Sequence, residues 1–128
     1  MIGAIVTHDA AVLKASEIAS RVLAPSAAQN DKAGRFSTEA IESLGESGLL
    51  GLLLPVDFGG SGLGPRTFAT VMAALAEADA SVAMVYLMHI LGATTMSARS
   101  WPEQNPRPAP VRIIARHVPS SASSAHVW

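Results

Sequence analysis

Apolar residues recur at helical spacing along most of the chain, and this spacing predicts four helices joined by short loops. The first helix is expected from about Asp9, as its N-cap, to Asn30. Its apolar stripe is formed by Val12, Ala15, Ile18, Ala19, Val22 and Leu23. The next stripe position, Ser26, is polar, and Pro25 removes a backbone donor within the same pattern. We therefore predict that this helix kinks or splits near Pro25.

The second helix has a start signal and a stop signal. Ser37 is placed to cap a helix over Thr38–Ser47, and Gly48 follows at the position where helices usually end. The apolar run Leu49–Leu54 then stops at Pro55. Its length predicts a buried extended connector.

Two further helices follow a glycine-rich loop. Pro65 suits the first turn of a helix that reaches Ala78, with Phe68, Val71, Met72 and Leu75 on one side. Ser81 is the expected N-cap of a fourth helix that ends near Ser97. This last segment is apolar on nearly every side, which is typical of a buried core helix. The apolar stretch Ala80–Met96 is shorter than the ~20 residues that a bilayer requires, so we expect no membrane span.

The composition changes after the fourth helix. Five of the eight prolines fall between Trp101 and Pro119, and the residues beyond Ser97 carry four Arg and one Glu. We therefore divide the chain into an all-α domain, residues 1–97, and an irregular Pro-, Ser- and Arg-rich tail, residues 98–128. The tail is expected to be mobile and dispensable, with one short extended piece at Val111–Ile114.

Overall charge and cysteine content exclude several classes of function. The formal net charge of −1 gives no electrostatic reason to bind nucleic acid or an anionic membrane. The chain has no Cys, which excludes disulfides and thiolate metal sites and fits a cytoplasmic protein. The short apolar start, Met1–Val6, lacks the basic residues and the length of a secretory signal.

The loop Gly59–Gly64 has the glycine content of a phosphate cradle. It matches neither a P-loop, because no Lys-Ser or Lys-Thr follows, nor the dinucleotide fingerprint. We favour a structural turn in which glycine permits positive φ and close packing.

His89 is the histidine within the apolar part of the domain. We expect it to lie in the core or to line a pocket, and an acid–base role stays open because His titrates near neutrality. No His or carboxylate lies at ligand spacing from it, so no metal site is predicted. No residue is assigned a catalytic or cofactor-binding role.

The motifs, taken in order, resemble the acyl-CoA dehydrogenase family. The most specific part is the segment SGLLGLLLPVDFGGSG, residues 47–62, and the similarity extends over about residues 10–96. Other matching segments are Ile18-Ala19, Val22–Pro25, Gly34–Phe36, Leu75–Ala83 and His89. The tail after the fourth helix departs from the family pattern.

The resemblance implies a flavoprotein with a helical N-domain, a β-barrel middle domain and a helical C-domain. FAD lies between the last two, and a glutamate of the C-domain removes a proton from the acyl-CoA thioester. We expect neither part in this chain, so that it represents the N-terminal domain, truncated or frame-shifted, and is inactive and FAD-free alone. The alternative is a stand-alone helical module that binds a protein partner or a lipid-like ligand. Acyl chain length and a monooxygenase-like activity stay open.

The resemblance also implies a substrate site on the fourth helix. The helix that borders the acyl-chain pocket in the family corresponds to the segment with Met84, Leu87, Met88 and Leu91. These four positions share one helical face, which could bury a fatty chain without offering it a polar group. The alternative is that the face packs on the other helices. If it stays uncovered, it favours self-association.

Overall fold

The computed structural model describes residue 5 and residues 7–99, in which the regular elements are all helical and no strand occurs. The helices are α1 (His8–Ile18), α2 (Ala24–Ala33), α3 (Thr38–Ser47), α4 (Pro65–Ala78) and α5 (Ala80–Arg99). A π-helical turn, Ala19–Leu23, joins α1 to α2, and 3-10 turns occur at Leu49–Gly51 and Val56–Phe58. If α1 and α2 are taken as one bent rod, the predicted all-α bundle of four helices is confirmed. The residues beyond Arg99, including Val111–Ile114, lie outside the described part.

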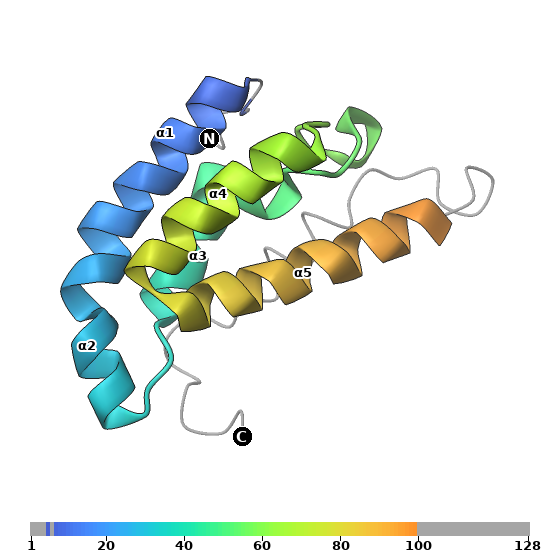
Figure 1. Ribbon diagram of the computed structural model, residues 1–128. Helices are drawn as coiled ribbons and strands as arrows, with labels where there is room; N and C mark the ends of the chain where they lie inside the picture. Colours follow the sequence, from blue (N-terminus) through green and yellow to red (C-terminus); the bar gives the residue numbers. More distant parts are fainter. Residues whose placement is uncertain (1–4, 6, 100–128) are drawn as a thin grey trace.

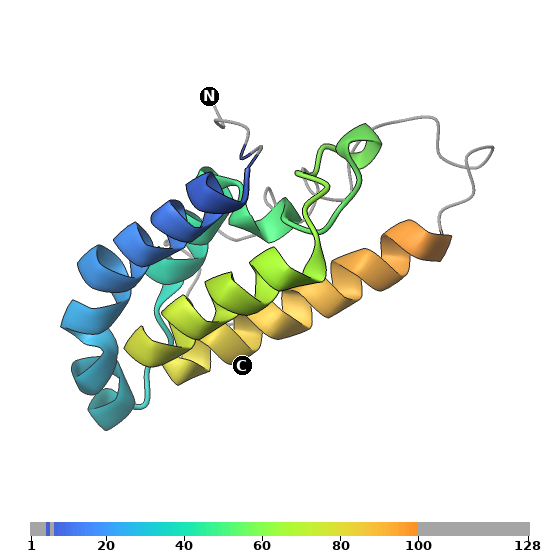
Figure 2. The ribbon, with the colours of Figure 1, turned by 45° about the horizontal axis from the view of Figure 1, so that its top comes forward.

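Helix α4 lies between α1 and α5, and α3 packs behind this layer (Figures 1 and 2). α4 and α5 run antiparallel, connected through Asp79 alone. At the other end of α4, Nδ1 of His8 lies 2.8 Å from the hydroxyl of Thr67 and links α1 to α4. The core between these elements is built mainly from Leu, Ile, Val and Ala, with Tyr86 as its largest fully buried side chain.

The predicted break near Pro25 is confirmed and takes the form of a π-helical turn. The amide of Ala24 donates to the carbonyl of Ala19, five residues back, where an α-helix would use the fourth. Pro25, which has no amide to donate, then sits in the first turn of α2. The hydroxyl of Ser26 donates to the carbonyl of Val22 at 2.9 Å, so that the polar residue on the stripe is satisfied within the helix.

Two of the predicted N-caps are wrong by two residues each. Thr7, not Asp9, caps α1, because its hydroxyl accepts the amide of Ala10 at 3.1 Å. Asp79, not Ser81, caps α5, because its carboxylate accepts the amides of Ser81 and Val82 at 3.0 and 3.2 Å. In each case the residue two positions before the predicted cap accepts the hydrogen bonds of the free amides at the start of the helix.

The signals around α3 are confirmed, but the connector that follows it is not extended. Ser37 accepts the amide of Ala40, and Gly48 ends the helix with φ of 84°. Leu49–Leu54 instead coils into a 3-10 turn and further turns. This shape lets Leu49, Leu52 and Leu54 all point into the core from a short segment, which an alternating strand could not do.

The glycine-rich loop is a structural turn, as predicted. A Cβ on Gly60 would lie 2.2 Å from the carbonyl oxygen of Leu54, so no other residue fits there. The amides of Gly60, Ser61 and Gly62 donate to Pro55, Gly51 and Leu54. Because these donors are already used within the chain, the loop has no free amide cluster with which to cradle a phosphate.

Candidate functional site

The inner face of α5 is anchored by two polar side chains. The hydroxyl of the fully buried Tyr86 donates to the carbonyl of Leu49 at 2.7 Å. One turn further along, Nε2 of His89 lies 3.0 Å from the carbonyl oxygen of Leu50, and the ring nitrogen is therefore the donor. These bonds satisfy two carbonyls of the turn after Gly48 and set the axial position of α5 against it.

The outer face of α5 is apolar and exposed. Met84 is 58% exposed, Met88 64% and Leu91 53%, whereas Leu87 lies half-buried at the edge of the face. We call this surface the outer face; it consists of Met84, Val85, Leu87, Met88, Leu91, Gly92 and Thr95. The four predicted substrate-site residues therefore do share one face. The expectation that α5 is a core helix buried on all sides is wrong, and so is the alternative that this face packs on the other helices.

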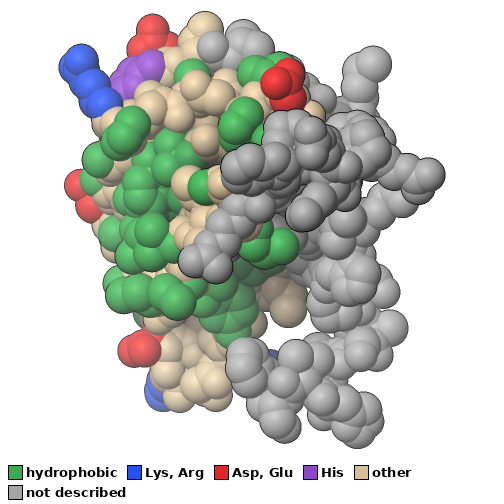
Figure 3. All heavy atoms as spheres, turned by 90° about the vertical axis from the view of Figure 1, so that its right-hand side faces the viewer, with side chains coloured by type: hydrophobic (Ala, Val, Ile, Leu, Met, Phe, Trp, Pro, Cys, Tyr) green, Lys and Arg blue, Asp and Glu red, His purple; other side chains and the backbone are tan. Residues whose placement is uncertain are grey.

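The outer face carries no charge. Residues 80–98 contain no Asp, Glu, Lys or Arg. In the view from the right-hand side of Figure 1, hydrophobic side chains cover much of the surface that is not drawn in grey, and charged side chains lie toward its margins (Figure 3). An exposed apolar surface of this kind is uncommon on a soluble protein unless it meets a ligand or a partner.

Gly92 is an unexpected feature of the outer face. It is exposed in the second half of α5, and an added Cβ would meet nothing within 4 Å. Glycine inside a helix costs about 1 kcal/mol relative to alanine, and no contact among the described residues requires it here. The glycine leaves a notch beside Met88, one turn away. Sequence reasoning missed this notch because a lone Gly in an apolar run gives no sign of whether it is exposed.

By length and composition, Ala80–Ala98 is also able to cross a membrane, and only 28% of that span is buried. Core helices of soluble proteins can be equally long and apolar, so length and composition alone do not distinguish a membrane span from a core helix. Spanning a bilayer would require releasing the hydrogen bonds of Tyr86 and His89 to the turn after Gly48. The inner face of α5 therefore favours a helix that stays docked on the turn after Gly48.

The ionisable groups of α5 are poorly suited to proton transfer. Burial raises the pKa of the Tyr86 phenol far above its usual range, so that this group stays neutral. Burial lowers the pKa of His89, and the hydrogen bond to Leu50 opposes this shift. Neither ring contacts a carboxylate in the described part of the chain. His89 is thus a half-buried residue whose ring is bonded to a backbone carbonyl.

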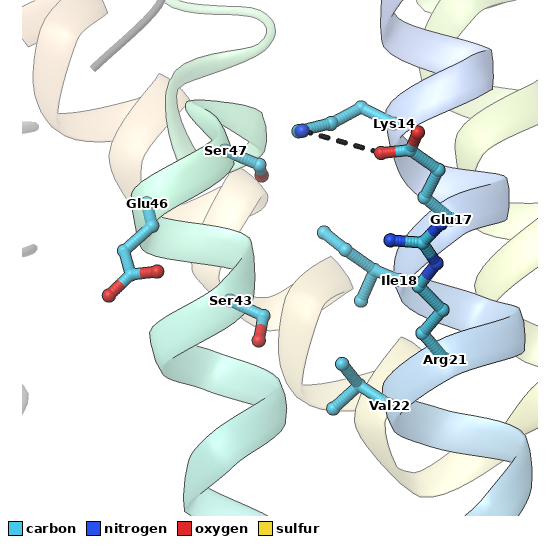
Figure 4. A pocket seen from close by; sticks show the side chains of 8 residues that line it. All are labelled: Lys14, Glu17, Ile18, Arg21, Val22, Ser43, Glu46 and Ser47. Carbon is cyan, nitrogen blue, oxygen red and sulfur yellow. Dashed lines mark hydrogen bonds and ion pairs between the residues drawn. The ribbon is translucent and has the colours of Figure 1, made fainter. Parts of the chain in front are cut away.

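A hollow of about 590 Å³ lies between α1, the π-helical turn and α3 (Figure 4). Its walls carry two cations, Lys14 and Arg21, and two carboxylates, Glu17 and Glu46. Lys14 pairs with Glu17 at 3.3 Å, and both side chains are well exposed. Mixed, solvent-screened charges of this kind select no class of ligand. Within residues 5 and 7–99, no group of His and carboxylate side chains could hold a metal ion.

The comparisons with known proteins agree with the helical fold. Residues 7–110 match the model of the acyl-CoA dehydrogenase N-terminal domain. L-evernosamine nitrososynthase of Micromonospora sp. is 36% identical over 72% of this chain and 21% of that protein. A probable acyl-CoA dehydrogenase of Mycobacterium tuberculosis is 31% identical over 66% of this chain and 22% of that protein. Mitochondrial isovaleryl-CoA dehydrogenase of Pongo abelii is 38% identical over 52% of this chain and 16% of that protein.

No solved structure matches the chain. The chain spans about a fifth of the length of the curated relatives it matches. The family match nevertheless covers most of the chain and includes all the described helices. The chain therefore belongs to the acyl-CoA dehydrogenase family and corresponds to its N-terminal helical domain.

Proposed function

We propose that this domain forms one wall of the substrate site in a flavin-dependent enzyme that oxidises an acyl-CoA thioester. The observation that carries the proposal is the outer face of α5, which is apolar, uncharged and exposed. Apolar walls with few polar groups are typical of sites that bind fatty chains. Met84 and Met88 also suit a ligand of variable shape, since the methionine side chain is flexible and polarizable.

The inner face supports the same proposal by holding the wall in place. Tyr86 and His89 tie α5 to the turn after Gly48, so that the outer face is presented from a fixed backbone. A site built on an anchored helix is positioned more accurately than one built on a loop. In this proposal Tyr86 and His89 are positioning residues, whereas Met84, Leu87, Met88 and Leu91 contact the acyl chain.

FAD enters the proposal only because the chain belongs to the acyl-CoA dehydrogenase family. FAD supplies the hydride acceptor in such enzymes. Among the described residues, the glycine-rich loop has its amides occupied and offers no phosphate cradle. We therefore propose that the FAD contacts and the catalytic base come from regions that the relatives possess outside the matched part. The described residues contribute the acyl-chain wall and exclude water from one side of it.

The names of the relatives point to more than one chemistry. One is named L-evernosamine nitrososynthase, and others are named as CoA-thioester dehydrogenases. A polar substrate needs hydrogen-bonding partners, yet the outer face offers Thr95 as its one polar side chain. The face therefore favours an apolar acyl group over a polar substrate.

The second candidate function is a stand-alone module that binds a lipid-like ligand. It is favoured by the fact that the outer face is already open in the described structure. One helix face, however, covers only one side of a ligand, whereas tight sites bury most of it. We therefore expect the isolated chain to bind acyl-CoA weakly, with a dissociation constant on the order of 1 mM.

The first test uses the purified chain. We expect it to carry no flavin absorbance, to show no acyl-CoA oxidation and to bind a twelve-carbon acyl-CoA only weakly in a calorimetric titration. A yellow chromophore that co-purifies together with dehydrogenase activity would overturn the assignment of flavin binding to other regions. Tight acyl-CoA binding without flavin would favour the stand-alone module.

The second test uses Met88→Asp in this chain and the same change at the aligned position of a full-length dehydrogenase relative. Because Met88 is exposed, the helical circular dichroism of this chain should be unchanged. In the relative, a carboxylate against the acyl chain should raise KM by about tenfold or more, equivalent to roughly 1.4 kcal/mol. The matched control is Asp at the position aligned with Ala73, an exposed residue of α4. Equal effects at both positions would remove α5 from the substrate site.

A further inference from the structure

We propose that Met84 and Met88 are a site of oxidative modification by a peroxide, and that their conversion to sulfoxides makes the acyl-chain wall polar. We call this change the oxidation switch. The modification itself rests on the exposure of the two side chains, whereas its effect on acyl-chain binding rests on the proposed function. The wall loses its apolar character while the helix that carries it stays folded.

The two methionines are accessible to a small oxidant. Met84 and Met88 lie four residues apart in α5, so that they are neighbours on the outer face, and each is more than half exposed. Cysteine thiolates are the usual first targets of a peroxide, but the chain contains no Cys. The exposed methionine sulfurs are therefore the atoms of the described residues that a peroxide oxidises first.

Met72 provides an internal comparison. It lies on α4, is only partly exposed and packs against the hydrophobic core. A peroxide reaches such a side chain less readily, and a sulfoxide there would place a polar group among apolar side chains. Met96, near the end of α5, is exposed and should react together with the pair. Exposure therefore predicts that Met84 and Met88 are oxidised before Met72.

The reaction balances with the peroxide as its only co-reactant. The thioether sulfur attacks one oxygen of hydrogen peroxide, so that an S–O bond forms as the O–O bond breaks. The sulfur loses two electrons, and the other oxygen takes them up together with a proton and leaves as water. The product is a sulfoxide, which is polar and chiral, whereas the methionine side chain is apolar.

Two sulfoxides change the chemistry of the outer face. Its one polar side chain, Thr95, already donates its hydroxyl to the carbonyl of Leu91 in the same helix. Oxidation adds two hydrogen-bond acceptors that a fatty chain cannot satisfy, so that covering them with the chain costs free energy. Because both methionines point away from the core, the bonds of Tyr86 and His89 to the turn after Gly48 are retained.

The modification is tested on the purified full chain exposed to hydrogen peroxide for increasing times. Peptide mass spectrometry should show oxidation of Met84 and Met88 at least about fivefold faster than that of Met72. The helical circular dichroism should be unchanged when the pair is fully oxidised. An equal rate at Met72 would overturn the assignment of the site, and so would a loss of helix that accompanies oxidation of the pair.

The effect on the wall is tested by titrating the chain with octanoyl-CoA before and after oxidation, with NMR chemical shifts as the readout. Oxidation should weaken binding at least about fivefold. Methionine sulfoxide reductases, one for each sulfoxide epimer, should restore it.

The matched control carries Met84→Leu together with Met88→Leu, which keeps the outer face apolar but removes its sulfur. Peroxide should leave octanoyl-CoA binding by this variant unchanged, although Met72 and Met96 are still present. A loss of binding in the variant would place the effect at another methionine and would overturn the oxidation switch.

The remaining outcomes separate the oxidation switch from the proposed function. Equal binding before and after full oxidation of the pair would overturn the switch and leave the acyl-chain wall in place. A parent chain that binds no octanoyl-CoA would contradict the proposed function and the switch together, whereas the order of methionine oxidation would still decide whether the modification site is correctly assigned.

Discussion

The two faces of α5 are similarly apolar but differ in their surroundings. Ile90 on the inner face is 2% exposed, whereas its neighbour Leu91 on the outer face is 53% exposed. The polar side chains of the central part of the helix, Tyr86 and His89, lie on the buried side, where each has a carbonyl partner. This arrangement reverses the usual amphipathic pattern. It leaves the outer face apolar without a covering contact among the described residues.

The difference between the two faces is tested most directly by truncating Ile90 and Leu91 to alanine in separate variants. Ile90→Ala should lower the free energy of unfolding by about 2–4 kcal/mol, because it leaves a cavity in the core. Leu91→Ala removes a side chain of the same composition and should change it by less than about 0.5 kcal/mol. Urea denaturation followed by circular dichroism measures both. Similar losses for the two variants would show that α5 is buried on both faces in solution.

A smaller effect is expected from the anchoring bond of Tyr86. Tyr86→Phe keeps the ring but removes the 2.7 Å hydrogen bond to the buried carbonyl of Leu49, which then accepts only the amide of Leu52 at 3.2 Å. This should cost about 1–2 kcal/mol of unfolding free energy. Thr95→Val, on the outer face, alters a hydroxyl that bonds only to its own helix and serves as the control. A neutral Tyr86→Phe variant would mean that the amide of Leu52 alone satisfies the carbonyl of Leu49.

The smallest expected effect is the pH dependence that His89 contributes. Burial lowers its pKa in the folded state, while the unfolded chain keeps the ordinary value of about 6.5. The unfolded state therefore takes up the proton first as pH falls. The stability contributed by neutral His89 is present above about pH 6.5 and is lost as pH falls toward the lowered folded pKa.

His89→Gln isolates this contribution, because glutamine can still donate to Leu50 but does not titrate. Unfolding free energies measured from about pH 7.5 to 5 should fall less steeply in the variant than in the parent chain. Parallel curves for the two proteins would show that His89 is equally solvated in the folded and unfolded states.

The elements set by local signals could be predicted from the sequence. Ser37, Gly48 and Pro65 act through their own backbone geometry and nearest amides, and each has the predicted role. The caps of α5 show where such signals become ambiguous. Asp79 and Ser81 are both good capping residues two positions apart, and the sequence alone does not decide which one accepts the free amides.

Features that depend on distant contacts could not be predicted in the same way. The apolar run Leu49–Leu54 is compatible with a strand or a turn, and the choice depends on the carbonyls that Tyr86 and His89 bind from α5. The sequence left the exposure of Met84 and Met88 open for a related reason. Apolar composition shows that a face avoids water, but not whether its partner lies within the same domain.

The π-helical turn between α1 and α2 shortens the lifetime of the backbone hydrogen bonds in α2. The extra residue in this turn rotates the side chains of α2 relative to those of α1. Ala11, Ala15 and Ile18 of α1 are buried, whereas no residue of α2 is. A ten-residue helix whose residues are at most partly buried has little tertiary support, and short helices are marginal in water. The amides of Ala24–Ala33 should therefore open and exchange with deuterium while α1 remains closed, so that α2 behaves as a separate, short-lived unit of an otherwise cooperative domain.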